Sequence, residues 1–160
     1  LFDGNRLGFT ENSFLQYDIA PENIGSGCYF LAWPTGHDYI VGFIGGRFAW
    51  NLSTQGEDEV VEYALSKLVN LSGSNIRKHF LKGFASDWAS NPLTKGSYSA
   101  VKPGYYGARE LLNEPIAEKL IFAGEATAGD LAGLVNGAYE SGKMAATRIS
   151  NIIKLKNKSL

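Results

Sequence analysis

The sequence has few of the residues that metal sites and many catalytic sites need. It contains one cysteine, Cys28, so it can form no disulfide within the chain and no thiolate metal cluster. Its two histidines, His37 and His79, lie far apart among apolar and aromatic neighbours. A catalytic triad or a zinc site needs further partners that the sequence does not supply around them. We therefore expect both histidines to be structural or to lie at the surface.

An excess of charge and long apolar runs are missing as well. The formal net charge is −1, which implies no general attraction to nucleic acid or to anionic lipid. No apolar run approaches the ~18 residues that a membrane span requires, and no signal peptide is visible. These observations predict no nucleic-acid partner, no membrane span and a cytoplasmic location. The basic residues 154–158 are interpreted as the solvated end of a helix.

The apolar residues that are present suffice for a core and are arranged in regular patterns. With 160 residues and 44% hydrophobic content, the chain has the size of one domain or of a piece of a larger protein. Aromatic and β-branched residues in 28–34 and 38–44 predict a β-hairpin. Acidic residues from Glu57 begin a predicted helix that ends at Gly73. A further strand is expected over residues 79–84.

The second half of the sequence begins with an irregular segment. Several proline and glycine residues predict a loop over residues 89–107, followed by a short helix over residues 108–112. The apolar run 119–123 predicts a buried strand, and residues 133–155 predict a long helix with small residues for close packing. Helices in both halves combined with a hairpin predict an α+β fold.

The segment between the last predicted strand and the long helix carries the clearest chemical signal. Gly124 allows a ligand to approach the backbone without a Cβ in the way. Glu125 offers two acceptor oxygens for ligand hydroxyls. The helix that begins near Gly133 presents unpaired N–H groups and the positive end of its dipole, which suit an anion. This pattern predicts a nucleotide or flavin contact, and ordinary strand–turn–helix packing with Glu125 as a cap is the alternative.

Two ordered motifs resemble the flavin-containing amine oxidase family. Ile121-Phe-Ala-Gly-Glu-Ala-Thr127, followed by Gly133-Leu-Val-Asn-Gly-Ala-Tyr-Glu-Ser-Gly142, is similar to the C-terminal FAD signature of that family. The family includes monoamine oxidases, polyamine oxidases and lysine-specific histone demethylases. Upstream, Trp88-Ala-Ser-Asn-Pro92 and Gly96-Ser-Tyr-Ser99 look like the family's second block at the family's spacing. The similarity covers residues 88–149 and, more weakly, the hairpin.

The resemblance implies a flavin-binding role for the matching residues. They are Trp88, Ser97, Gly124, Glu125, Ala126, Thr127, Gly133, Leu134 and Val135. Glu125 would meet the ribityl and phosphate region of FAD, and the Val135 amide would face the pyrimidine edge of the flavin. Some monoamine oxidases have a cysteine bonded to the flavin at the position of Ser97. Serine cannot form that thioether, so the resemblance implies FAD that is bound non-covalently.

Tyr98 and Leu134 match the two substrate-cage positions of the family. Tyr98 would form one wall of an aromatic cage that aligns the amine, and a buried loop tyrosine is the structural alternative. The second wall is usually aromatic, and here it is Leu134, which halves the cation–π contribution to an amine. This departure puts small-amine specificity in doubt. Trp88 would pack near the flavin or over the cage, or it would belong to the core.

The resemblance also divides the chain into two parts. Residues 1–87 would be part of a substrate-binding domain. Residues 88–160 would be the C-terminal part of an FAD-binding, Rossmann-like domain, to which they contribute the last strand and helix. The dinucleotide fingerprint Gly-x-Gly-x-x-Gly and the family's lysine do not occur in this chain. We therefore expect a C-terminal fragment that is inactive alone and that associates with the missing N-terminal half or with a second copy of the chain.

The activity implied for the parent protein is that of an oxidoreductase. It would oxidise the C–N bond of a small amine by hydride transfer to FAD, with oxygen as acceptor and peroxide as product. A related FAD oxidoreductase, desaturase-like or protoporphyrinogen oxidase-like, is an alternative that Leu134 favours and that Gly96-Ser-Tyr-Ser99 disfavours. A third hypothesis is a non-enzymatic half-domain that acts through a protein partner.

Overall fold

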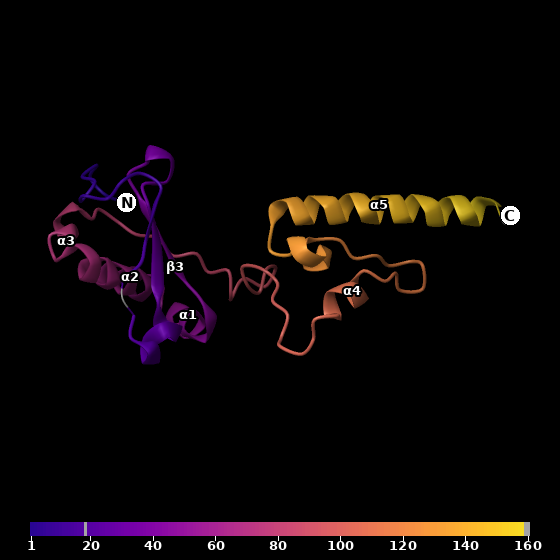
Figure 1. Cartoon of the computed structure of the whole chain (residues 1–160), viewed down its shortest axis with the longest axis horizontal. Helices are drawn as coiled ribbons and strands as arrows, with labels where there is room; N and C mark the ends of the chain where they lie inside the picture. Colours follow the sequence, from indigo (N-terminus) through magenta and orange to yellow (C-terminus); the bar gives the residue numbers. More distant parts are fainter. Residues whose placement is uncertain (18, 159–160) are drawn as a thin grey trace. The chain divides into compact units, whose positions relative to one another are not determined.

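The computed structural model describes residues 1–17 and 19–158. The chain divides into two compact units, Leu1–Asp87 and Trp88–Leu160, which are described separately. The first unit contains an antiparallel sheet with helices and the second contains helices and loops, so the α+β fold class is confirmed (Figure 1). The assignment of these ranges to a substrate domain and an FAD-binding domain stays a prediction.

The first unit is built on a three-stranded antiparallel sheet. Its strands are β1 (Ser13–Leu15), β2 (Cys28–Ala32) and β3 (Ile40–Ile44), in the order β1-β2-β3. The predicted hairpin is confirmed as β2 and β3, with strands shorter than expected. The strand β2 ends before Pro34, which has no N–H to donate, and the short 3-10 turn Pro34–Gly36 follows. Trp33 enters this turn with φ 49°, in the left-handed region.

Both faces of this sheet carry apolar side chains. On β2, the side chains of Cys28, Phe30 and Ala32 are buried on one face, and Tyr29 alternates to the other. The register places Phe43 opposite Tyr29, and Phe14 also lies on this outer face. Phe14 is 76% exposed and Phe43 is 48% exposed, so the outer face is an uncovered apolar surface in the structure.

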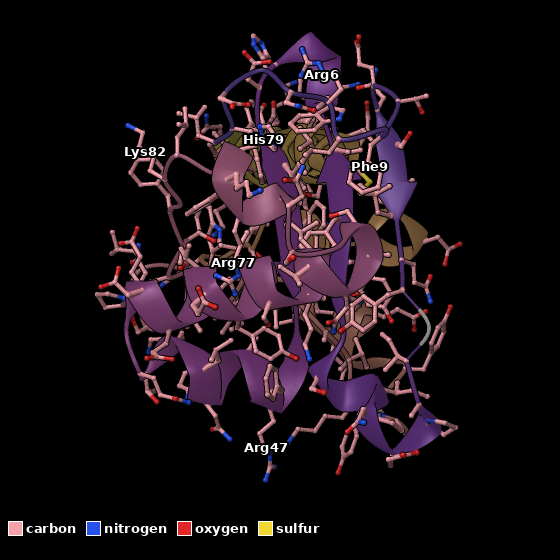
Figure 2. All side chains as sticks on the ribbon, turned by 90° about the vertical axis from the view of Figure 1, so that its left-hand side faces the viewer. Arg6, Phe9, Arg47, Arg77, His79 and Lys82 are labelled. Atoms are coloured by element: carbon pink, nitrogen blue, oxygen red, sulfur yellow. The ribbon has the colours of Figure 1, made fainter. Side chains whose placement is uncertain are left out.

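Three helices accompany the sheet (Figure 2). They are α1 (Gly46–Ser53), α2 (Glu57–Ser72) and α3 (Ile76–His79). The predicted helix is confirmed as α2, which begins with three acidic residues and ends at Gly73, whose φ is 82°. Leu65 and Leu68 of α2 join Phe30 and Trp33 in one buried cluster. This cluster is the core of the first unit.

The strand predicted over residues 79–84 is reduced to an isolated bridge. Phe80 forms one antiparallel bridge with Phe2, in which the Asp3 amide donates to the His79 carbonyl and the Leu81 amide donates to the Leu1 carbonyl, each at 3.0 Å. The Ala85 amide donates to a side-chain oxygen of Glu57 at 3.3 Å instead of to a neighbouring strand. Gly83 lies directly on α2, since a Cβ there would come within 2.4 Å of Val61. The backbone therefore follows the helix surface and leaves the sheet.

An apolar groove of about 1010 Å³ lies in the first unit. Its walls come from β3, from the apolar side of α2 and from residues 80–87. Ile40, Val60, Leu65 and Phe84 are among the residues that line it. The groove reaches core residues such as Phe30 and Leu65, and it lies in the same unit as the exposed outer face of the sheet.

The second unit contains two helices joined by turns and loops. They are α4 (Ala108–Leu112) and α5 (Val135–Lys158), with 3-10 turns at Glu125–Thr127 and Gly129–Leu131 between them. Both helices and the irregular segment 89–107 confirm the expectation from the sequence. None of the helices among the described residues is long and apolar enough to cross a bilayer.

The strand predicted over residues 119–123 is wrong. Leu120 forms only a tight bridge with Ile116, in which the Ile116 amide donates to the Leu120 carbonyl at 2.9 Å. The described part of the second unit contains no other strand, so this apolar run has no ladder to join. Phe122 is 43% exposed as a result. The last strand of the expected Rossmann-like domain is therefore not formed, and that two-domain arrangement stays a prediction.

The small residues of α5 are used for close packing at one point. A Cβ at Gly137 would lie 2.1 Å from the carbonyl oxygen of Leu131, so the 3-10 turn Gly129–Leu131 rests directly on the helix. One turn further along, Ser141 is only 3% exposed. The start of α5 is thus fixed against the segment that precedes it.

Candidate functional site

The turn at Gly124 has a backbone conformation that favours glycine. Its φ is 145°, and a Cβ there would meet no heavy atom within 4 Å. The Gly124 amide donates to the Ser141 hydroxyl at 2.8 Å, and that hydroxyl lies 2.9 Å from the Gly124 carbonyl. Thr127, which is buried, donates to the same carbonyl at 3.0 Å. The Gly124 backbone is therefore fixed by α5 while the side where a Cβ would lie is open.

The carboxylate of Glu125 joins two separate loops. Its Oε1 accepts the Ser99 amide at 2.8 Å. Its Oε2 accepts the Ser99 hydroxyl at 2.8 Å and the Gly133 amide at 2.7 Å. Burial acts to raise the pKa of Glu125, but these hydrogen bonds and the charge of Arg109 outweigh it and lower the pKa below its ordinary value. Glu125 is thus an anion that three protein donors stabilise.

The short helix α4 supplies a second layer of contacts to this turn. Arg109 donates from Nη1 to the Ser99 hydroxyl at 2.7 Å and to the Ala126 carbonyl at 3.0 Å, and from Nη2 to the Ser99 carbonyl at 3.2 Å. Asn113 donates to the Thr127 carbonyl at 2.9 Å. Sequence reasoning missed both residues. Their spacing of four positions, which places them on one helix face, is the signal that could have found them.

The N-terminus of α5 presents amides that have no partner within the helix. The first bond of the regular helical pattern runs from the Ala138 amide to the Leu134 carbonyl at 3.1 Å. The amides of Val135, Asn136 and Gly137 precede it and point out of the helix end. Val135 is 90% exposed. Such a terminus favours an anion or a ring that acquires negative charge.

The residues predicted for the substrate cage are accessible. Tyr98 is 73% exposed and Leu134 is 49% exposed among the described residues. Trp88 is 52% exposed in this chain. Its carbonyl accepts the Gly96 amide at 2.9 Å, which closes a loop that ends directly before the exposed Ser97. Hydrogen bonds thus connect the predicted site residues Gly124, Glu125, Thr127 and Gly133, while the roles of all the predicted residues stay predictions.

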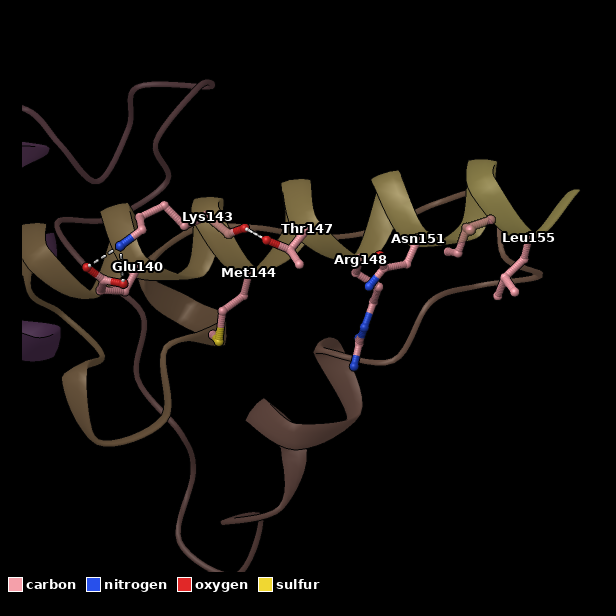
Figure 3. Close-up of a pocket in the computed structure, with 8 residues that line it drawn as sticks. Glu140, Lys143, Met144, Thr147, Arg148, Asn151 and Leu155 are labelled. Carbon is pink, nitrogen blue, oxygen red and sulfur yellow. Dashed lines mark hydrogen bonds and ion pairs between the residues drawn. The ribbon is translucent and has the colours of Figure 1, made fainter. Parts of the chain in front are cut away.

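Two further pockets lie in the second unit. One, of about 370 Å³, is lined by Ser99, Val101, Leu112 and other residues around Arg109. The other, of about 490 Å³, runs along α5 beside Met144 (Figure 3). The second pocket contains none of the predicted site residues. Its charged residues are engaged locally, since Lys143 contacts Glu140 at 3.1 Å.

The histidines and the cysteine are engaged in local packing in the first unit. His37 stacks on Tyr39, with ring centroids 5.9 Å apart, and His79 contacts Asp3 at 3.0 Å. Cys28 is fully buried, and burial raises its pKa to about 12, so it is a protonated thiol at neutral pH. Within residues 1–17 and 19–158, no three of the acidic, histidine and cysteine side chains are grouped so that they could bind a metal ion.

Comparison with known proteins places the chain in a family. The model of the flavin containing amine oxidoreductase family matches residues 10–150. The chain is 36% identical over 132 residues to polyamine oxidase 5 of Oryza sativa subsp. japonica. The matched region covers 80% of this chain and 26% of that protein. It is 29% identical over 133 residues to lysine-specific histone demethylase 1 homolog 3 of Arabidopsis thaliana, covering 80% of this chain and 8% of that protein.

The chain belongs to the flavin-containing amine oxidoreductases. A third relative, histone demethylase-like protein A of Aspergillus fumigatus, is 32% identical over 146 residues, covering 86% of this chain and 13% of that protein. The chain therefore spans about a quarter or less of the length of the relatives compared here. Membership of this family implies flavin binding, and the chain's own residues fit such a cofactor. A Cβ at Gly124 or at Gly133 would meet no heavy atom within 4 Å, and the N-terminal amides of α5 follow directly after Gly133 and Leu134.

Proposed function

We propose that this chain is the C-terminal part of an FAD-dependent amine oxidase that binds its cofactor non-covalently. FAD, when bound, supplies the two-electron oxidation of an amine C–N bond, with oxygen as acceptor and peroxide as product. The observation that carries the proposal is the unpaired N-terminus of α5, which the Glu125 carboxylate ties to the open turn at Gly124 through Gly133. Family membership supports the choice of flavin over another anionic ligand.

Each residue of the site would have a separate role in binding the cofactor. Gly124, Ala126 and Thr127 form the turn along which the cofactor would lie, and the buried Thr127 side chain keeps that turn rigid. The Val135 amide would donate to the pyrimidine edge of the flavin and stabilise negative charge on it. Glu125 already accepts three protein hydrogen bonds, so it would act mainly by keeping this backbone in place. A carboxylate has about four acceptor positions, which leaves one for a ribityl hydroxyl.

The proposed substrate is a small amine that Tyr98 and Leu134 would hold. The exposed Tyr98 ring offers a π-face to an ammonium group, which is worth about 0.5–1 kcal/mol at an exposed site. Leu134 offers apolar contact without a ring, so only Tyr98 would make a cation–π contact with the ammonium group of the amine. The relatives' names include polyamine oxidases and histone demethylases, which supports amines of different sizes as candidates.

Two alternatives each have an observation in their favour. A desaturase-like or protoporphyrinogen oxidase-like activity is favoured by Leu134, since such substrates need apolar walls more than cation–π contacts. A non-enzymatic role through a protein partner is favoured by the uncovered outer face of the sheet, where Phe14 is 76% exposed. The proposed partner of the isolated chain is the N-terminal half of the parent protein or a second copy.

The experiment that tests the proposal uses two proteins. One is the 160-residue chain and the other is the product of the complete reading frame that contains the codon for Leu1. Both are titrated with FAD by flavin fluorescence and assayed for peroxide release with a panel of amines. We expect the complete product to bind FAD tightly and to release peroxide, and the isolated chain to do neither because the sequence contains no Gly-x-Gly-x-x-Gly for the ADP half of FAD.

The outcomes separate the hypotheses. A complete product that binds FAD but releases peroxide with no amine would favour the related oxidoreductases. A reading frame that starts at Leu1 and encodes a protein without flavin binding would favour the partner-binding role. Stoichiometric FAD binding by the isolated chain would contradict the proposed fragment status.

A further inference from the structure

The loops that carry the two proposed cage residues meet at a single carboxylate. Ser99, the residue after Tyr98, donates its amide and its hydroxyl to Glu125, each at 2.8 Å. Gly133, the residue before Leu134, donates its amide to the same carboxylate at 2.7 Å. One side chain therefore binds the immediate neighbours of both cage positions. These positions are far apart in the sequence but are connected through two hydrogen-bonded links.

We propose that Glu125 is a positioning residue that sets the spacing between Tyr98 and Leu134, and that Arg109 fixes Glu125 and Ser99 for this purpose. The proposal rests on the proposed function, in which Tyr98 and Leu134 hold the amine. It assigns Arg109, Ser99 and Glu125 to substrate specificity without direct contact with the substrate.

Arg109 determines the direction of the Ser99 hydroxyl proton. Its Nη1 donates to Ser99 Oγ at 2.7 Å, which leaves the hydroxyl proton to point at Glu125 Oε2. Donor and acceptor bonds arranged in such a chain polarise and strengthen one another. Arg109 also donates to the carbonyls of Ser99 and Ala126, so it contacts both the loop of Ser99 and the turn that follows Glu125. Among the described residues, Arg109 is the charged group whose field acts on Glu125.

The negative charge and both oxygens of Glu125 are needed for this arrangement. A glutamine at this position would offer one acceptor oxygen and one NH₂ group, and the NH₂ group would face the donors of Ser99 or Gly133. In either orientation at least one of the three hydrogen bonds would be replaced by a donor–donor contact, so the link to at least one loop would weaken. The distance between the cage positions would then be held less tightly, although each loop would keep its own turns, such as the bond from Gly96 to Trp88.

The first test is an NMR titration of the 160-residue chain in the absence of flavin and amine. Two amides that bind one carboxylate must respond to the same protonation. We expect the ¹⁵N and ¹H shifts of Ser99 and Gly133 to titrate with one shared midpoint below the ordinary glutamate value. Arg109→Lys keeps a charge but loses the planar fork, so the shared midpoint should move upward. Different midpoints for the two amides, or a shared midpoint that Arg109→Lys leaves unchanged, would overturn the proposal.

The second test measures the spacing itself with spin labels at Ser97→Cys and Asn136→Cys. Cys28 is buried and protonated and does not compete for the label. We expect one narrow distance distribution, which Glu125→Gln broadens and Glu140→Gln leaves unchanged, since Glu140 is an exposed carboxylate paired with Lys143. A distribution that stays narrow in Glu125→Gln would refute the proposal. If Glu125→Gln fails to fold, the titration of the unaltered chain decides. Neither test depends on amine oxidation, so failure here is distinct from failure of the proposed function.

Discussion

The two units of the chain are stabilised in different ways. Every fully buried apolar side chain among the described residues, including Phe30, Trp33 and Ile76, belongs to the first unit. In the second unit the buried side chains are polar, namely Thr127 and Ser141, and hydrogen bonds from Arg109 and Asn113 connect the turns. A hydrophobic core is non-directional and tolerates small shifts, whereas a polar network fails when one partner is lost. The unit with the candidate site therefore depends on directional hydrogen bonds more than on buried apolar surface.

Truncation of the core should have the largest effect and should be confined to the first unit. Phe30 is 1% exposed in the centre of β2. Phe30→Ala should cost about 3–5 kcal/mol of unfolding free energy, because it removes buried surface and leaves a cavity. Urea denaturation, monitored by NMR signals from each unit, would measure this loss of unfolding free energy. Phe14→Ala, on the exposed face of the same sheet, is the control and should cost far less. Equal losses in both units would contradict the comparison.

Overpacking of α5 should have the next largest effect and should be confined to the second unit. At Gly137, a Cβ would come within 2.1 Å of the Leu131 carbonyl oxygen. Gly137→Ala should therefore destabilise the second unit by about 1–3 kcal/mol. Gly142 lies in the same helix with no heavy atom near its Cβ position, so Gly142→Ala should stabilise by about 0.5–1 kcal/mol. Amide exchange along α5 would measure both changes, and a Gly137→Ala protein as protected as Gly142→Ala would exclude the close contact.

Acid should weaken the second unit through Glu125. Its pKa is lower in the folded chain than in the unfolded chain, so the unfolded chain takes up the proton first as the pH falls. The stabilisation is therefore complete above the ordinary glutamate pKa and is lost as the pH falls through the folded value. The protection of the Ser99 and Gly133 amides from hydrogen exchange should decline as the pH is lowered from about 5. Glu125→Gln should abolish this pH dependence. Unchanged protection in acid would show that the carboxylate contributes nothing.

The smallest change is expected for the thiol of the first unit. Cys28 is fully buried and its pKa is raised to about 12, so the reactive thiolate is scarce at pH 8. Iodoacetamide should leave the native chain unmodified at that pH and should modify it in urea. Mass spectrometry would follow the reaction. In Phe30→Ala the rate should rise as the core loosens, and fast labelling of the unaltered chain would mean that the first unit opens readily.

The sequence predicted those elements whose signals are local. Acidic residues from Glu57 and the glycine at 73 mark the two ends of α2, and Pro34 marks the end of β2. The strand predicted over residues 119–123 was wrong because a strand requires a neighbour, and an apolar run does not reveal whether one is present. Arg109 and Asn113 were missed because polar residues in and directly after a five-residue helix resemble a solvated surface. The turn from Gly124 was predicted, but its link to Ser99 depends on tertiary structure.

The outer face of the sheet, with Phe14, Tyr29 and Phe43, has a consequence for the architecture of the whole protein. A sheet in a two-layer fold has one apolar face and one polar face, whereas a sheet that is apolar on both sides is the middle layer of three. Here the side chain of Phe30 on β2 points toward the helices and that of Tyr29 points away from them. This pattern is typical of a middle layer, and the helices cover one of its two faces. The apolar residues on both faces of the strands are typical of a buried sheet. A further layer packed on Phe14, Tyr29 and Phe43 would stabilise the sheet by removing these side chains from water.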